Sequence, residues 1–561
     1  MKNNDNYDVI VIGAGFGGPV AAKLCADAGL NVLLVERAQK PGEKVISGLT
    51  IPIYGFLFGP KFIRNGNPPI ERPADGIINY IFTDINKGEF EIDDTLKIPK
   101  PLSPVIAFGY NAYCQPFCEW EVKKAIESGV IFKSSTSVVE LIKDHEYIRG
   151  VITDNGQKYY SKVVIDAEGS QGLIAVKAGI RKKYPPDAIS LADTYDYEMS
   201  KKLIDEIFEY SIRFCWGWDE QKISPPLGYG NGLMVWPYRK SLHFIQDQCL
   251  KLKNSKVPNL KKVFKKYHQN ITEKLPWWKN LVNPNIKLRA KLWQCFEIYV
   301  GIDEPLNTMP KYDNGIILIG DAAGLESTEL CDGVPSAWFS AEIAANVATS
   351  AITQNNLSAK FMNMYDQKIK DHSIIQWSIS GKNRFNLRYA QERHDEILLK
   401  NIIHNGWGLG ALTHFTVPFL KLFLKYFKND KFVVKEWILM FFRYFQNWLF
   451  NSYGETEQKI RKKQDDLNLK NSWFFKILYK IIFKFSAPLF NVVLSICKFF
   501  LPISLEKLDE KIAQFLPKIE PIYFSFLNYF EPIGDALSKK LINYVLRANP
   551  SLFNPYIVRR A

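Results

Sequence analysis

The first forty residues constrain the fold most, because they join an apolar run, a glycine-rich turn and a second apolar run that ends in an acid. The run Val9–Ile12 predicts a buried strand, and Gly13, Gly15 and Gly18 follow it at the GxGxxG spacing. Such glycines provide a tight turn, a close backbone approach to a diphosphate and close packing of the next helix. We therefore predict a dinucleotide site at the N-terminus of a helix over residues 19–28.

An acid at the end of the second apolar run indicates which dinucleotide binds. Residues 32–35 end at Glu36, whose carboxylate suits the two hydroxyls of an adenosine ribose. A carboxylate there would repel a 2′-phosphate, so the pattern disfavours NADP. We predict that FAD is the cofactor and that Glu36 and the neighbouring Arg37 contact it.

The positive charge is concentrated at the C-terminal end of the chain. The formal net charge is +14, and residues 405–561 hold 23 Lys and Arg against 12 Asp and Glu. No zinc-finger spacing, helix-turn-helix signature or RNP motif accompanies these lysines, and Phe, Trp, Leu and Ile lie between them. We therefore predict a membrane surface as partner, and no nucleic acid.

The cysteines predict neither a disulfide framework nor a metal site. All eight are scattered without a CxxC pair, so we expect no zinc ion, no iron–sulfur cluster and no other metal. Cys114 and Cys118 lie one helical turn apart and are expected to be buried thiols rather than a redox couple. Because the first strand follows Met1–Asp5 at once, we expect no signal peptide and a cytoplasmic location.

The middle of the chain predicts a sheet, an insertion and the second half of the cofactor site. Residues 41–104 are expected to form loops with a few strands. A helix is predicted over residues 113–129, strands over 130–132, 138–142, 148–153 and 158–165, and an acidic turn ends the strand within 162–172. A strand over 315–320 precedes Asp321, which is placed to hold a ribityl hydroxyl, and a helix over 333–351 follows.

These motifs, in this order, resemble a large flavoprotein group that includes aromatic hydroxylases, geranylgeranyl reductases and FixC-type electron-transfer flavoprotein–quinone oxidoreductases. The likeness is strongest to the geranylgeranyl reductase and FixC branch and covers roughly residues 5–395. Its further carriers are the segments 44–48 (KVISG), 69–72 (PIER), 166–169 (DAEG), 228–237 (GYGNGLMVWP) and 320–324 (GDAAG). The resemblance implies FAD contacts at Gly13, Gly15, Gly18, Glu36, Val138, Asp321 and Gly333.

Three departures from this branch bear on the substrate. Residues 113–120 lack the customary arginine near the flavin, Glu168 stands where an aspartate is usual, and the C-terminal cluster cysteines of mitochondrial-type quinone oxidoreductases are absent. Electrons would then come from a separate donor, such as an electron-transfer flavoprotein or a ferredoxin.

The last 157 residues predict a helical extension that lies in a bilayer interface. In the run from Trp473, lysines 476, 480 and 484 fall on one helical stripe among Phe, Ile, Leu and Tyr. Only thirteen uncharged residues separate Lys484 from Lys498, fewer than the roughly 20 that a spanning helix needs. We expect a monotopic protein on the cytoplasmic membrane face. The alternative is a helical domain whose lysines form its solvated face.

The predicted fold class is α/β, with a Rossmann-type FAD-binding domain of the hydroxylase and geranylgeranyl reductase type that is interrupted by a mixed-sheet substrate domain. The predicted domains are residues 1–179 with 306–355 for FAD, 180–305 for substrate, a helical connector over 356–404 and the basic extension over 405–561.

Because the flavin supplies the chemistry, the sequence offers only weak catalytic candidates: Cys331 beside the flavin, and Trp236, Tyr229 and Tyr238 around an apolar cavity. The first hypothesis is a peripheral membrane enzyme that passes electrons from a soluble donor to a quinone. The second is reduction of isoprenoid double bonds in a lipid. A third, from another class, is a flavin-binding membrane scaffold or redox sensor without turnover.

Overall fold

The computed structural model describes residues 6–43, 48–84, 87, 89–93, 108–183, 189–216, 233–249, 260–298, 310–326 and 333–379, together with Leu422 and Met440. Almost all of them belong to the first of two compact units, which comprises residues 1–97 and 109–422. The second unit comprises residues 98–108 and 423–561. The sheets and helices of the first unit carry the candidate site.

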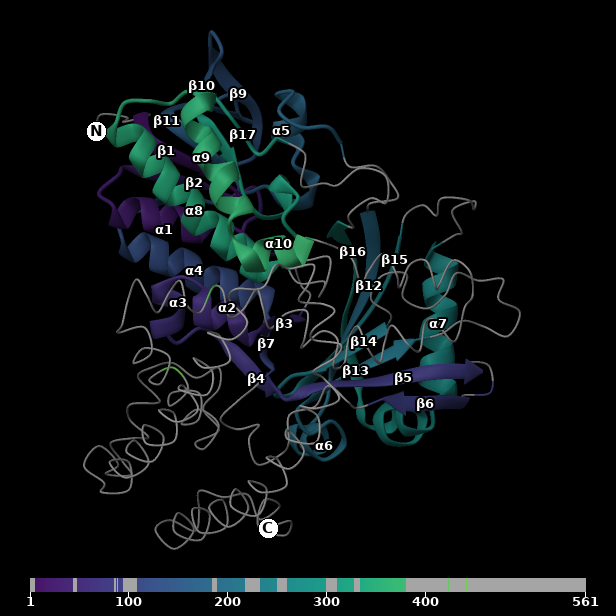
Figure 1. Cartoon of the computed structure of the whole chain (residues 1–561). Helices are drawn as coiled ribbons and strands as arrows, with labels where there is room; N and C mark the ends of the chain where they lie inside the picture. The colour runs from purple at the N-terminus through teal and green to yellow at the C-terminus, as the bar shows by residue number, and fades with distance from the viewer. Residues whose placement is uncertain are drawn as a thin grey trace, which may run out of the picture. The chain divides into compact units, whose positions relative to one another are not determined.

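A mostly parallel sheet forms one half of this unit (Figure 1). Strand β1 (Asn6–Ile12) pairs in parallel with β2 (Val32–Val35) on one side and with β11 (Lys158–Asp166) on the other. Both faces of such a strand are covered, which explains its continuous apolar run. The order is β17-β18-β11-β1-β2-β8, with the hairpin of β9 and β10 beside β11. The remaining strands are β8 (Ile131–Lys133), β9 (Val138–Asp144), β10 (Tyr147–Thr153), β17 (Tyr312–Asp313) and β18 (Ile316–Leu318).

Helices with small side chains cover this sheet. α1 (Gly18–Asp27) packs against both α4 (Cys114–Glu127) and α8 (Val334–Thr353), and the three lie beside one another in Figure 1. Alanine and serine dominate α8, so it approaches its neighbours closely. α9 (Ala359–Lys370) and α10 (Ser373–Ile379) pack on α8. The predicted helices and strands of this half are confirmed, with ends that shift by one to three residues.

A second sheet of seven strands has the order β16-β12-β15-β14-β13-β5-β6. β5 pairs with β13 in parallel and the other pairs are antiparallel, so the predicted mixed sheet is confirmed. The strands are β5 (Gly76–Asp84), β6 (Glu89–Asp93), β12 (Ile189–Glu198), β13 (Ser211–Trp216), β14 (Leu233–Pro237), β15 (Ser241–Cys249) and β16 (Lys287–Ile298).

The segment over residues 41–104 corrects the sequence interpretation. It was expected to form loops with a few strands within the FAD-binding range 1–179, and it does contain strands, but β5 and β6 from this segment complete the edge of the second sheet. The described part of the segment also holds α2 (Ile53–Phe58), α3 (Lys61–Asn65), β3 (Gly48–Pro52) and β4 (Ile70–Ala74). Pairing over such a distance in sequence leaves no local signal, because β13 lies more than 120 residues after β5.

One face of the second sheet is packed against α7 (Leu260–Lys274) and the turns that follow it. Side chains alternate along β12, so Tyr195 and Tyr197 join the aromatic core on this face while Ala192 and Asp196 face the other way. Trp278 is fully buried in the same core. The opposite face is therefore left for the candidate site.

A three-stranded sheet of order β3-β7-β4 connects the two halves, with β7 (Gly109–Tyr113) at its centre. Two further short helices are α5 (Leu173–Lys177) and α6 (Lys201–Ile207). Among the described residues, no helix combines the length and apolar character needed to cross a bilayer. The predicted extension over 405–561 lies outside the described residues apart from Leu422 and Met440.

Candidate functional site

The glycine turn after β1 is shaped by its own backbone. Gly13 has φ +98°, and a Cβ on it would lie 2.4 Å from the carbonyl oxygen of Ala167. A Cβ on Gly18 would lie 1.9 Å from the carbonyl oxygen of Gly13. Around Gly15, by contrast, no other atom lies within 4 Å of the Cβ position. The turn therefore closes tightly at its two ends and stays open in its middle, which fits the approach of a diphosphate.

Glu36 lies at the end of β2 and is held by the same turn. Its carboxylate accepts the backbone N–H of Ala14 at 2.7 Å and that of Ala38 at 2.8 Å. Arg37 extends to the acidic turn, where Nη1 donates to Oε1 of Gln171 at 3.2 Å. These contacts fix the carboxylate beside the glycine turn, at the place where an adenosine ribose is expected.

One continuous cavity of about 550 Å³ joins the two sheets. Gly13, Gly15, Glu36, Arg37, Val138, Asp321 and Gly333 all border it, so the structure brings these predicted residues together. Gly18 lies behind the turn instead, against Gly13. Its place agrees with the packing role that the glycine spacing predicts for it, rather than with a direct contact to the ligand.

The second predicted half of the cofactor site borders the same cavity. Asp321 follows β18 in a short helical turn over Gly320–Ala323, and a Cβ on Gly333 would lie 3.1 Å from its Oδ1 atom. The Gly320 N–H donates to Oγ of Ser340 on α8 at 3.0 Å, which ties this turn to the helix. α8 begins at Val334, so its N-terminal N–H groups are directed at the cavity, where they favour negative charge.

The acidic turn after β11 holds two carboxyls close together. Asp166 is fully buried, and its Oδ1 accepts the N–H of Glu168 at 3.0 Å. Burial, and secondly the charge of Glu168, raises the pKa of Asp166 to about 7. Glu168 borders the cavity and accepts the Ile174 N–H at 2.8 Å, and burial also raises its pKa. Glu168 thus accepts a backbone N–H from the first turn of α5 and also borders the cavity.

The second sheet supplies the far wall of the cavity. Ala192 of β12, Met234 and Trp236 of β14 and Ile245 of β15 border it. Trp236 therefore lies where the sequence placed it, whereas Tyr229 and Cys331 lie outside the described residues. Tyr238 is fully buried and stacks on Tyr113 with ring centroids 4.3 Å apart, so it lies behind the wall rather than on it.

The close pair of thiols is buried, as predicted. Cys114 and Cys118 are free cysteines of α4 with no exposed surface. Cys114 borders the cavity. Burial raises the pKa of the Cys118 thiol well above its usual value, which disfavours a reactive thiolate. Across the described parts of the chain, no group of three or more His, Cys, Asp or Glu side chains could hold a metal ion.

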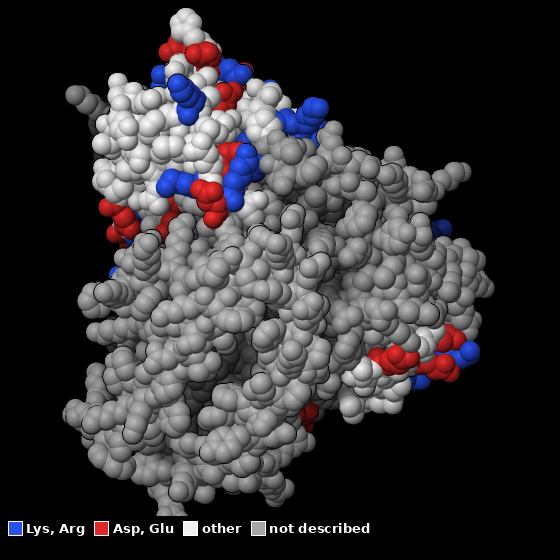
Figure 2. Space-filling model, in the orientation of Figure 1, with Lys and Arg blue, Asp and Glu red and all other residues white. Residues whose placement is uncertain are grey.

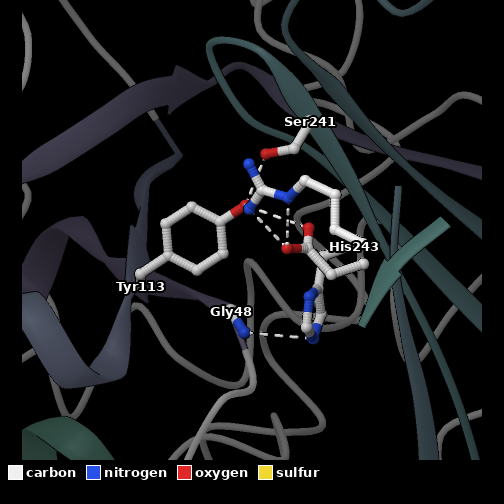
Figure 3. Close-up of polar contacts among 6 residues, drawn as sticks. Gly48, Tyr113, Ser241 and His243 are labelled. Atoms are coloured by element: carbon white, nitrogen blue, oxygen red, sulfur yellow. Dashed lines mark hydrogen bonds and ion pairs between the residues drawn. The ribbon is translucent and has the colours of Figure 1, made fainter. Parts of the chain in front are cut away.

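The resemblance carried by the segment 44–48 places that segment near the flavin, but sequence reasoning missed how its Gly48 joins the two walls. Gly48 borders the cavity, and its N–H donates to Nε2 of His243 at 3.1 Å across 195 residues of sequence (Figure 3). Ala192 and Ile245 were missed for a similar reason, because apolar residues of a strand carry no sign of which face they occupy. Only the alternation along β15, with His243 and Ile245 two residues apart, hinted that they share a face.

Several known proteins are similar to this chain in sequence or in fold. A digeranylgeranylglycerophospholipid reductase from Methanocaldococcus jannaschii is 27% identical over 378 residues, which cover 66% of this chain and 83% of that protein. The protein FixC from Azorhizobium caulinodans is 23% identical over 380 residues, or 66% of this chain and 82% of that protein. The crystal structure of a geranylgeranyl bacteriochlorophyll reductase-like protein from Thermoplasma acidophilum shares the fold, with a TM-score of 0.56 at 20% identity over 78% of this chain and 99% of that one.

The sequence profile of the FAD dependent oxidoreductases matches residues 8–293, more than half of the chain. This range contains the glycine turn, Glu36, the acidic turn and most of the second sheet. FAD is the cofactor, as predicted from the first forty residues. The chain belongs to the family of FAD-dependent oxidoreductases and is an enzyme of that family.

Proposed function

We propose that this enzyme passes electrons from a soluble donor to an apolar acceptor that enters the cavity from a membrane, and that the acceptor is a quinone. The observation that carries this proposal is the continuity of the cavity. It runs from the glycine turn to Met234, Trp236 and Ile245 of the second sheet. An acceptor against these side chains would share one water-poor space with the cofactor.

Each wall of the cavity has a separate task in this proposal. Bound FAD would supply the reversible exchange of two electrons. The glycine turn, Glu36 and Asp321 would hold the cofactor, and the N-terminus of α8 would stabilise negative charge near its ring. The apolar wall would orient the acceptor and exclude water. Reduction of a quinone to a quinol takes two electrons and two protons, with the protons drawn from solvent.

The electron donor and the membrane are parts of the same proposal. The resemblance to FixC-type proteins supports an electron-transfer flavoprotein or a ferredoxin-like donor. The basic, aromatic-rich sequence over 405–561 supports peripheral attachment to the cytoplasmic membrane face. On the face drawn in Figure 2, the described surface carries acidic and basic side chains side by side. The positive charge expected to bind anionic lipid therefore comes from the extension rather than from this surface.

A prenyl lipid is the second candidate acceptor. The specific observation in its favour is the match with the digeranylgeranylglycerophospholipid reductase, which spans most of that protein. Saturation of one isoprenoid double bond also takes two electrons and two protons. The same apolar wall would then hold a chain rather than a ring.

One anaerobic experiment separates these functions. The purified protein, bound to liposomes that contain anionic lipid, is reduced and its flavin absorbance is followed after addition of a quinone or of a geranylgeranylated lipid. Reoxidation by the quinone alone supports the proposal. Reoxidation by the lipid with loss of its double bonds supports the second candidate instead. A flavin that neither compound reoxidises favours a scaffold or redox sensor without turnover.

A further inference from the structure

Gly48 occupies a position in the cavity wall that permits no side chain. It is the first residue of β3, is buried and borders the cavity. A Cβ on Gly48 would lie 1.5 Å from the hydroxyl oxygen of Tyr238 and 2.2 Å from its Cζ atom. The backbone is therefore in direct contact with a tyrosine of the second sheet's hairpin.

The same glycine is held by a hydrogen bond from its backbone. Its N–H donates to Nε2 of His243 at 3.1 Å, and Figure 3 shows the imidazole ring turned toward this amide. Burial lowers the pKa of His243 to about 3, so the ring is neutral at any working pH. Because Nε2 accepts, the ring proton lies on Nδ1.

This arrangement leaves an unsatisfied donor. His243 is fully buried, and its Nδ1 atom has no hydrogen-bond partner among the described residues. A buried donor without a partner destabilises the folded protein. An apolar side chain at this position would remove that donor but would leave the buried Gly48 N–H without its acceptor, so the imidazole is the group that satisfies the Gly48 amide.

The elements that hold Gly48 also form the acceptor wall. Tyr238 follows directly after β14, and His243 lies on β15 opposite Trp236. The rings of Trp236 and His243 are stacked, with centroids 6.2 Å apart and planes inclined by 25°. Trp236 borders the cavity from the second sheet, while Gly48 borders it from β3. A movement of the Trp236 ring would reach Gly48 through His243.

A polar network fixes this hairpin from the other side. The hydroxyl of Tyr113 donates to Oδ1 of Asp196 at 3.1 Å and bonds with Oγ of Ser241, as Figure 3 shows for Tyr113 and Ser241. Asp196 also accepts from Nε of Arg289 at 3.0 Å. The hairpin is thus held by hydrogen bonds on both sides and cannot shift without breaking some of them.

We propose that His243 is a positioning residue that couples the two walls of the cavity. Through the Gly48 N–H it sets the backbone at the cofactor side, and through its stacking on Trp236 it responds to the acceptor side. The proposal rests on the proposed function only in treating the Trp236 wall as the acceptor site. Its effect on the cofactor side stands on the cavity geometry and on FAD as cofactor.

Substitutions at one position test this role. His243→Gln keeps an acceptor near the place of Nε2, whereas His243→Asn has the same chemistry but is too short to reach Gly48. His243→Leu removes the acceptor altogether. We expect His243→Asn and His243→Leu to shift the absorbance maximum and the reduction potential of the bound flavin and to raise the acceptor KM about tenfold. His243→Gln should stay close to the wild type. If the leucine variant does not fold, the Gln and Asn pair carries the test.

His268→Leu is the matched control. His268 is a half-buried, neutral histidine against the second sheet: it lies on α7, burial lowers its pKa to about 4, and its Nε2 bonds with the hydroxyl of Tyr197 at 2.6 Å. Its loss should lower stability without changing the flavin spectrum or potential. The proposal is overturned if His243→Asn leaves spectrum and potential unchanged, or if His268→Leu shifts them equally. Because both readouts need no acceptor, they remain valid even if neither proposed acceptor reacts.

Discussion

The glycine turn after β1 and the hairpin of β14 and β15 border the same cavity, but they are built from different atoms. In the turn, the tight contacts are between backbone atoms: Gly13 with Ala167, and Gly18 with Gly13. In the hairpin, side chains make the wall, and they are held by other side chains such as His243 and Tyr113. The cofactor half therefore depends on a few glycines, whereas the half proposed to hold the acceptor depends on many side chains.

This difference explains how one architecture serves several reactions. A backbone cradle for a dinucleotide can remain constant while the facing wall changes its side chains and with them its substrate. The comparison also determines what kind of substitution should damage each half. Substitutions that enlarge a side chain should disrupt the turn, and substitutions that truncate a side chain should disrupt the wall that the hairpin forms.

The largest effect is expected from atoms added to the turn. Gly18→Ala places a Cβ 1.9 Å from the carbonyl oxygen of Gly13, so α1 must move away from β1. We expect a protein that is purified without FAD and whose unfolding free energy is lower by about 1–3 kcal/mol. Flavin content after gel filtration and denaturant unfolding of the apoprotein measure the two effects.

Gly15→Ala is its matched control, because no atom lies within 4 Å of that Cβ position and the cavity borders it. This variant should be as stable as the wild-type apoprotein. It should nevertheless bind FAD only weakly, since the new methyl group occupies the space of the diphosphate. Equal loss of stability in both variants would show that the turn is not closed by Gly13 and Gly18.

The next effect is expected from atoms removed from the hairpin. Trp236→Ala deletes a half-buried ring from the acceptor wall while the glycine turn stays intact. Loss of its apolar contacts, about 1.5–3 kcal/mol, should raise the acceptor KM roughly 10- to 200-fold with normal FAD content. Steady-state kinetics with the acceptor that reoxidises the flavin measure the change, with Trp236→Phe as the conservative control. Loss of FAD in the alanine variant would contradict the separation of the two halves.

The same contrast explains what the sequence could predict. The strand, the glycines, the helix and Glu36 lie within 40 residues of one another. Each contacts residues that are close in sequence or fixed by the fold type, so their positions were predictable. The wall draws on β12, β14 and β15 and on Gly48, which its partner His243 follows by 195 residues. Contacts of that kind depend on which strands pair. The pairing of β5 with β13 is an example that composition alone did not reveal.

A smaller effect is expected where a side chain braces the cofactor half. Oε1 of Glu121 on α4 accepts the indole N–H of Trp338 on α8 at 2.7 Å, and burial raises the pKa of Glu121 well above its usual value. A neutral carboxyl predicts that Glu121→Gln changes the unfolding free energy by less than about 1 kcal/mol. Glu121→Ala leaves the indole N–H without an acceptor and should lower the unfolding free energy by about 2 kcal/mol. Denaturant unfolding compares the two, and equal destabilisation would indicate an ionised Glu121.

The last expected effect is on the pH dependence of stability, which distinguishes the cofactor half from the hairpin. The raised pKa of Asp166, about 7 against a usual 3.8, means that the folded protein binds a proton that the unfolded chain releases. The stability from this proton is fully present below pH 3.8 and is lost as the pH rises through about 7. Glu168 contributes in the same direction, whereas the nearby charge of Arg181 opposes the shift.

The Asp166 proton should therefore lower the Tm of the wild type by a few degrees between pH 5 and pH 8. Asp166→Asn retains an acceptor for the Glu168 N–H and should flatten this fall. His243→Gln should deepen this fall, because burial lowers the pKa of the folded His243 to about 3 whereas the unfolded chain takes up a proton on it below 6.5, which destabilises the wild type at the acidic end of the range. Thermal unfolding across this range tests both variants. An equal pH dependence of the Tm in the wild type and in Asp166→Asn would show that Asp166 does not titrate between pH 5 and pH 8.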